Sequence, residues 1–337
     1  MLEDPRWLPF DLDLRAGQFL FVEADRAFIE STPFLDQRAD LTGKRRAALA
    51  FNQLPAPAEK QAAPTFIWHS AFCASTLLAR CLSVEGRTIA YSEPSGLATL
   101  ASLKRHGRTA EFNRLFPLYM NLLARPPADA GRVVIKPTNA ANTLISDCAA
   151  LWPDARHLFV TSELPVFLTS ILKKSEPGRA FARQLYTMFA RDGSLLGQIP
   201  PEQAFQLTDI QIAALVWQAQ LAMMREASAK LDPARTAWLD GDDFLARPEA
   251  SLDAASRFLG LGLDAQAVQT VAAGPLMSRD VKNPGKAFDP ASRRAPAGLK
   301  PLMDSHFDAV IAWSASVART PQSPYPARPL VDPPHTR

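Results

Sequence analysis

The sequence is poor in cysteine, in charge of one sign and in long apolar runs. Three cysteines in 337 residues cannot form a disulfide framework, so a reducing compartment, the cytoplasm, is expected. The formal net charge of +3 does not mark a nucleic-acid-binding protein. No apolar run approaches the roughly 20 residues that span a bilayer, and the acidic start MLEDPRWLPFDLDL lacks the apolar region of a signal peptide. We therefore expect no membrane span and no nucleic-acid partner.

Apolar residues and prolines, in contrast, are abundant. An apolar share of 47% excludes global disorder, and 337 residues suffice for two domains or one enlarged α/β domain. The 29 prolines exceed the usual share of about 5%, and several fall in a linker at 54–64 and in a tail from 321 onward. Residues 1–54 alternate apolar and polar side chains around Ala16-Gly17, which predicts a hairpin. We expect a β-rich extension at 1–54, an α/β domain at 55–320 and an extended Pro-rich tail at 321–337.

Short apolar segments alternate with helical segments through the middle of the chain. Segments of about four to six residues are the length of buried parallel strands. Helical spacing is clearest over 208–230, whose apolar positions form one buried stripe, so this helix is interpreted as core. The pattern predicts a parallel sheet covered by helices on both faces, with ligands at the carboxyl ends of the strands. The expected strands are 65–69, 88–91, 132–136, 157–161 and 235–239.

The first strand-to-helix turn combines small residues with hydroxyls. TFIWH leads into residues 70–76, and the spacing of the leucines that follow starts a helix near Ser75. First-turn amides lack helical partners, so such a turn can bind an anion, although Ser and Thr also cap helices everywhere. A Walker A loop would need two glycines and a lysine where His69, Ala74 and Ser75 stand, and only Thr76 fits. An ordinary ATPase loop is therefore not expected.

This turn resembles the phosphosulfate-binding loop of the sulfotransferase family, which has the P-loop fold. Other segments fall in the family's order: Ser92-Glu93-Pro94 after the second strand, Ile135-Lys136-Pro137 after the third, and WPDARHLFV at 152–160. The stretch WLDGDDF at 238–244 with FLGL at 258–261 is similar to a later family signature. The resemblance covers roughly 65–285.

The resemblance implies a donor, 3′-phosphoadenosine-5′-phosphosulfate, and the residues that would hold it. Two basic positions of the family are replaced here, by Phe72 in the loop and by Ser162 at the 3′-phosphate arginine. The charge is then expected from Lys136, Lys173 and Lys174, or from the late cluster Arg279, Lys282 and Lys286, which falls where related enzymes have a basic loop. The candidate donor-binding residues are Ser70, Cys73, Ala74, Ser75, Thr76, Ser162, Ser170 and Lys282.

Sulfuryl transfer needs a base for the acceptor's proton and cations for the transferring group. Glu93 follows a strand and precedes Pro94, which makes it the candidate base, although Glu-Pro also opens many helices. Lys136 ends an apolar strand, so it is expected to face the cleft or to form a salt bridge, and Lys104 is expected on an exposed helix as its control. His69, at the end of the first strand, is either a catalytic or a structural histidine.

The other polar clusters are given structural interpretations. Asp240, Asp242 and Asp243 follow the last strand and are expected to cap a helix or form a turn. No spacing of His, Cys and carboxylates predicts a metal site. Cys73 is expected to be a small filler, and Cys81 and Cys148 core residues.

The acceptor cannot be named from the sequence beyond a small molecule or peptide. Residues 174–207 and the β-rich extension are expected to frame its pocket, with Phe181, Tyr186 and Phe189 either lining it or packing inward. Three functions stay open: a sulfotransferase-like enzyme, a P-loop kinase-like phosphotransferase, and a catalytically silent nucleotide-binding module. The oligomeric state is not predicted.

Overall fold

The computed structural model describes residues 2–54, 61–282, 287, 293, 300–318 and 329–331. The short apolar segments form a five-stranded parallel sheet with the order β5-β6-β4-β7-β8. The central strand β4 carries the loop with the candidate anion site, between β6 and β7. All five strands were predicted within one residue. They are β4 (Thr65–His69), β5 (Thr88–Ser92), β6 (Arg132–Lys136), β7 (His157–Thr161) and β8 (Thr236–Asp240).

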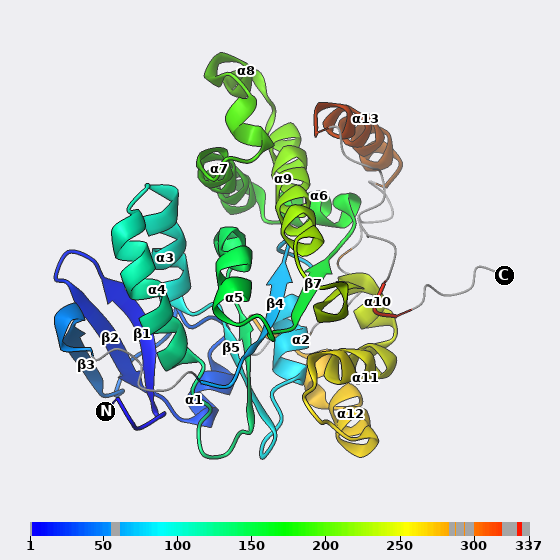
Figure 1. Cartoon of the computed structure of the whole chain (residues 1–337). Coiled ribbons are helices and arrows are strands. Elements are labelled where there is room, and N and C mark those ends of the chain that lie inside the picture. The colour runs from blue at the N-terminus through cyan, green and yellow to red at the C-terminus, as the bar shows by residue number, and fades with distance from the viewer. Residues whose placement is uncertain are drawn as a thin grey trace.

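Helices cover both faces of this sheet, as predicted (Figure 1). Alternate strand residues face two separate apolar clusters, for example Ile67 in one cluster and Phe66 and Trp68 in the other. The cluster around Ile67 contains α2 (Ser75–Cys81), α10 (Gly241–Ala246), α11 (Pro248–Leu259) and α12 (Ala265–Ala272). The other cluster contains α3 (Ser95–Arg105), α4 (Thr109–Leu123), α5 (Ile145–Leu151), α6 (Leu164–Lys173), α7 (Ser175–Arg191), α9 (Asp209–Ala229) and α13 (Lys300–Ala318). Short elements complete the chain: α8 (Pro201–Gln206) and the 3-10 helices η1 (Phe51–Gln53), η2 (Asn139–Leu144), η3 (Leu195–Gln198), η4 (Pro233–Arg235) and η5 (Pro275–Ser278).

The β-rich extension is an antiparallel sheet of three strands, drawn in blue beside α3 and α4 in Figure 1. The predicted hairpin joins β1 (Trp7–Asp13) to β2 (Gln18–Glu23), and Gly17 takes the left-handed backbone (φ +69°) that the turn requires. β3 (Arg46–Ala50) pairs with β2, and α1 (Arg26–Ser31) lies next to β5. Asp11 accepts hydrogen bonds from Ser95 and Thr99, which fixes β1 to the first turns of α3.

The predicted capping of the helix after β8 is confirmed. The Asp240 side chain accepts from the amides of Asp242 and Asp243 and starts α10. Cys73, Cys81 and Cys148 are buried and unpaired. The 208–230 prediction corresponds to α9, which is buried along most of its length. Of the Pro-rich tail the structure describes only 329–331, where Pro329 bridges Trp238 of β8. Among the described residues, no helix has the length and apolar character to cross a bilayer.

Candidate functional site

The loop after β4 leaves a row of backbone amides without partners. Ala71, Phe72 and Ala74 have positive φ angles of 66°, 50° and 60°, a conformation that costs a non-glycine residue about 1–3 kcal/mol. Within the described ranges, the amides of 72–77 donate to no acceptor, because the first bond of α2 runs from Leu78 to Ala74. Strained backbone and free amides at a strand end are features that anion-binding loops share.

His69 holds this loop in place rather than facing open space. Its Nδ1 accepts the Ala71 amide at 3.1 Å, and its Nε2 lies 3.0 Å from the Pro137 carbonyl oxygen. A carbonyl only accepts, so Nε2 carries the proton and both ring nitrogens are occupied. Burial, with Lys136 and Lys282 nearby, holds the pKa of His69 well below its usual value. His69 is therefore neutral, and its geometry is that of a structural histidine.

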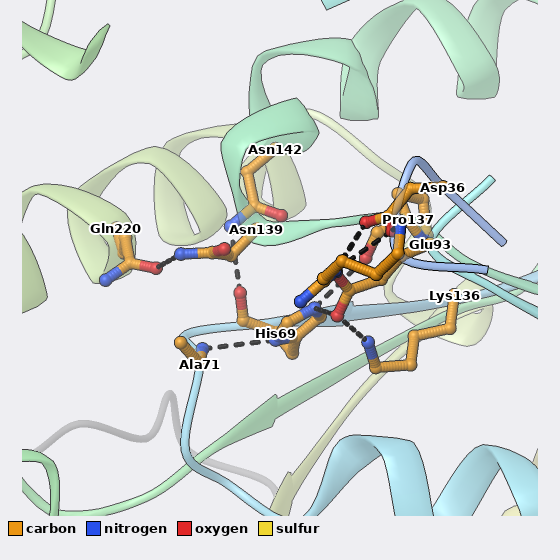
Figure 2. A network of polar contacts seen from close by, with 10 residues as sticks. Asp36, His69, Ala71, Glu93, Lys136, Pro137, Asn139, Asn142 and Gln220 are labelled. Carbon is orange, nitrogen blue, oxygen red and sulfur yellow. Dashed lines mark hydrogen bonds and ion pairs between the residues drawn. The ribbon is translucent and has the colours of Figure 1, made fainter. Parts of the chain in front are cut away.

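Glu93 and Lys136 form an ion pair at the adjacent strand ends (Figure 2). Lys136 Nζ donates to Glu93 Oε1 at 2.7 Å, and the Lys136 side chain is 0% exposed while that of Glu93 is 12% exposed. The Glu93 amide donates to the Lys136 carbonyl, and Glu93 has φ +52°. Burial favours the neutral acid, but Lys136, Lys282 and Arg38 outweigh it and lower the pKa of Glu93. The carboxylate is thus ionised and held in a fixed position.

A segment of the β-rich extension closes one side of this pair. Arg38 Nη2 lies 3.2 Å from Glu93 Oε2, and its guanidinium stacks 3.7 Å from the centre of the Phe34 ring. The ammonium groups of Lys136 and Lys282 lie 5.9 and 5.7 Å from the same ring. Sequence reasoning missed Phe34 and Arg38, since nothing in residues 34–38 distinguishes them from an ordinary surface loop.

Arg293 contacts Phe72 and Ser162, the two positions at which the resemblance predicts basic residues. Its Nη2 donates to the carbonyl of Phe72 and to the hydroxyl of Ser162, both at 2.8 Å. Asp242 lies 3.0 Å from its Nε. Arg293 is not among the basic residues expected to supply positive charge at these positions, so it is a further functional candidate that the sequence did not reveal. The only signal was its place in the same late basic region.

Lys282 also lies beside the loop. Its ammonium is 5.9 Å from the centre of the Phe72 ring, as is that of Lys174. The residue as a whole is exposed, yet protein surrounds the ammonium, and this surrounding, with Lys136 nearby, lowers the pKa of Lys282 to about 8. Lys286 lies outside the described residues.

Buried polar atoms without partners gather at the same edge of the sheet. Among the described residues, the hydroxyls of Ser70, Ser92 and Thr161 and the Asn142 side-chain oxygen make no hydrogen bond. They follow or end β4, β5 and β7, or lie in η2 after β6. Asn142 also donates to the His69 carbonyl at 3.1 Å. Most buried polar groups in proteins are paired, so this concentration marks the edge as unusual.

The structure brings together most, but not all, of the predicted residues. Ser70, Cys73, Ala74, Ser75 and Thr76 form the loop and the start of α2, next to Ser162, Lys282, His69, Glu93 and Lys136. The Ser170 hydroxyl instead donates to Val166 in its own helix, α6. The expectation for Lys104 was wrong: it pairs with Asp147 and donates to the Thr143 carbonyl, which ties α3 to α5.

A hollow lies on another side of α7. It has a volume of about 520 Å³ between α7, η3, α8 and α9. Phe181 of α7 packs on Phe72, with ring centres 5.7 Å apart, whereas Tyr186 lines this apolar hollow. Phe189 is fully buried in the core. The three aromatic residues considered for one acceptor pocket therefore point to three different places.

Among the described residues, no group of three or more His, Cys, Asp or Glu side chains is arranged to hold a metal ion. Gly241 lies against the loop, since a Cβ there would come within 2.1 Å of the Cys73 carbonyl oxygen. This close approach was not visible in the sequence.

Comparison with known proteins returns sulfotransferase structures. The "Sulfotransferase Domain from the Curacin Biosynthetic Pathway" is 14% identical over 78% of this chain and 99% of that chain, with a TM-score of 0.43. The sulfotransferase from Alicyclobacillus acidocaldarius is 14% identical over 77% and 97%, with a TM-score of 0.41. The sulfotransferase domain of the Synechococcus PCC 7002 olefin synthase is 16% identical over 76% and 98%, with a TM-score of 0.40. No model of a protein family and no curated protein matches the chain. These three solved structures, to which this chain is similar, are sulfotransferases.

Proposed function

We propose that this chain is a sulfotransferase that moves a sulfuryl group from 3′-phosphoadenosine-5′-phosphosulfate to a hydroxyl or amine of a small-molecule or peptide acceptor. The observation that carries the proposal is the Arg293 guanidinium, which contacts both Phe72 and Ser162 beside the unpaired amides of 72–77. The charge that the sequence lacks at these two positions is supplied from a distant part of the chain.

The donor carries several negative charges, and the loop offers groups of the opposite kind. Among the described residues, the amides of 72–77 donate no hydrogen bond. Arg293, Lys282 and Lys174 add cations around Phe72. In this proposal the loop and Ser75 and Thr76 hold the phosphosulfate, and Arg293 with Ser162 holds the 3′-phosphate. Ser170 takes part only if its hydroxyl leaves the Val166 carbonyl.

The ion pair next to the loop supplies the proton acceptor. The acceptor's oxygen or nitrogen forms a bond to sulfur, the sulfur–oxygen bond to the donor phosphate breaks, and the acceptor's proton passes to Glu93. In this proposal Lys136, at 2.7 Å from Glu93, is the cation that stabilises the transferring group. His69 serves as the support of the loop, because both of its ring nitrogens are engaged.

Isothermal titration calorimetry with adenosine 3′,5′-bisphosphate and with ATP plus magnesium tests the donor. We expect the bisphosphate alone to bind, and Arg293→Met to weaken it at least tenfold. Arg235→Met is the matched control, because Arg235 pairs with Asp154 at the opposite edge of the sheet. Binding of ATP with magnesium alone favours a kinase, and binding of neither favours a silent module.

Transfer itself is tested at Glu93. Glu93→Gln is expected to abolish turnover while calorimetric binding of the bisphosphate survives. Undiminished turnover in this variant would reject the role of the carboxylate. Lys230→Met replaces Lys104→Met as the control for Lys136→Met, because Lys230 is an exposed lysine that pairs with Glu226 of its own helix region.

A further inference from the structure

Residues 34–38 of the β-rich extension form hydrogen bonds with the turn that carries Glu93. The Leu35 amide donates to the Ser92 carbonyl at 2.8 Å, and the Ser95 amide donates to the Leu35 carbonyl at 2.9 Å. These two bonds bracket Glu93, whose φ of +52° is unfavourable for a residue with a side chain. Such a backbone persists only where its surroundings hold it, and the extension supplies part of that hold.

Arg38 is half-exposed, and two neighbouring side chains hold its guanidinium. Its Nε donates to both carboxylate oxygens of Asp36, at 2.9 and 3.0 Å, and its guanidinium plane rests on Phe34. The group that reaches Glu93 Oε2 is therefore fixed by a ring on one side and a carboxylate along one edge. Lys136 holds the other oxygen of Glu93, Oε1.

We propose that Arg38 is a positioning residue: it fixes the second carboxylate oxygen of Glu93 and so orients the group that receives the acceptor's proton. The inference rests on the proposed function, in which Glu93 is the base. It makes the extension a working part of the reaction centre rather than an appended sheet.

Charged or titratable groups from every neighbouring element face Glu93. Lys136 comes from β6, and the ring of His69, whose Nε2 is 3.8 Å from Oε1, comes from β4. Lys282 comes from the late segment, and Arg38 with Asp36 from the extension. Removing Arg38 leaves Lys136 and Lys282 in place, so the carboxylate should become more basic without losing its charge at neutral pH.

The test compares Arg38→Met with Arg45→Met. Arg45 belongs to the same extension, stacks 5.3 Å from the Trp7 ring centre and pairs with Glu23 at 3.1 Å, which matches the setting of Arg38 away from the site. Titration of ¹³C-labelled glutamate by NMR follows the Glu93 carboxyl, whose resonance is identified by its loss in Glu93→Gln. Arg38→Lys tests rescue, and Arg38→Gln replaces Arg38→Met if that variant does not fold.

We expect the pKa of Glu93 to rise by about one unit in Arg38→Met, to return most of the way in Arg38→Lys, and to stay unchanged in Arg45→Met. Affinity for adenosine 3′,5′-bisphosphate should stay within twofold in all three variants. An unmoved pKa of Glu93 in Arg38→Met overturns the inference. Failure of the wild-type protein to bind the bisphosphate would instead count against the proposed function, and the NMR result would still decide whether Arg38 controls Glu93.

Discussion

Two regions of the molecule, the strand ends of the candidate site and the hollow behind α7, are built in opposite ways. The edge where β4, β5 and β6 end collects an ion pair, free amides and unpaired hydroxyls. The hollow between α7, α8 and α9 is lined mainly by apolar side chains, and its Arg183 is paired with Asp209 on the surface. Phe205 of α8, at its rim, is 89% exposed.

The difference follows from how each region is made. Parallel strands end together, so residues from distant parts of the sequence meet at one edge with their backbone groups partly free. Helices satisfy their own backbone, so a gap between them is bounded by side chains alone. Volume therefore identifies the hollow behind α7, whereas the buried ion pair and the free amides distinguish the strand-end edge as the candidate site.

The largest expected effect comes from breaking the buried ion pair. Lys136→Met leaves the Glu93 carboxylate without its closest cation, and loss of one partner of a buried pair costs about 3–5 kcal/mol. Arg183→Met breaks the exposed pair with Asp209 at the other hollow, and exposed pairs contribute at most about 1 kcal/mol. Urea unfolding of both variants measures the two free energies.

Adding Glu93→Gln to Lys136→Met provides the check on this prediction. The double variant should recover much of the loss, because no buried charge is then left alone. Equal losses of unfolding free energy in Lys136→Met and Arg183→Met would show that the buried and the exposed ion pair do not differ in their contribution to stability.

The second-largest effect is expected at His157, a buried histidine outside the candidate site. His157, at the start of β7, accepts from the Trp68 indole at 3.0 Å, and burial lowers its pKa to about 4. The unfolded chain binds a proton near pH 6.5 and the folded chain does not, so stability falls as the pH drops from about 6.5 to about 4. The loss amounts to about 3 kcal/mol and is complete below the folded pKa.

His157→Gln keeps an acceptor for the indole and removes the titration. Urea unfolding at pH 7, 5.5 and 4.5 should therefore give a smaller pH dependence for this variant than for the wild type. Equal slopes in the two proteins would show that His157 does not bury a neutral ring. In that case the lowered pKa of His157 would not account for the pH dependence of stability.

Much of the fold could be predicted because its signals are local. Short apolar runs between turn residues gave all five parallel strands, and the carboxyl ends of the strands pointed to His69, Glu93 and Lys136. The site's other members could not be found in this way. Arg38 reaches Glu93 across 55 positions and Arg293 reaches Phe72 across 221, and neither contact leaves a pattern in the neighbouring residues.

Two side chains have partners in the fold that the sequence did not predict. Lys104 occupies a helix whose spacing suits an exposed lysine, but Asp147 of α5 comes within reach only in the folded chain. Ser170 follows the family's spacing, yet its hydroxyl bonds to its own helix. Composition and the periodicity of apolar residues predict a single element. They do not predict which side chains of other elements contact it.

A smaller effect is expected at the contact between the loop and α10. Gly241→Ala places a methyl group 2.1 Å from the Cys73 carbonyl oxygen, so the loop must shift at a cost of about 1–3 kcal/mol. Affinity for adenosine 3′,5′-bisphosphate should fall with it. Gly131→Ala is the control, because its Cβ would meet only the Arg87 carbonyl at an ordinary 3.6 Å. Calorimetry and urea unfolding compare the two, and equal behaviour would mean that the loop tolerates displacement.

The smallest expected effect tests which side of α7 belongs to the candidate site. The Phe181 ring supports Phe72, and an aromatic pair of this kind contributes about 0.5–1.5 kcal/mol, so Phe181→Leu should weaken bisphosphate binding a few-fold. The Tyr186 hydroxyl has no hydrogen-bond partner among the described residues, so Tyr186→Phe should change neither stability nor binding. If Tyr186→Phe weakened binding as much as Phe181→Leu, the hollow behind α7 would have to be counted as part of the same site, and charge would no longer separate the two regions.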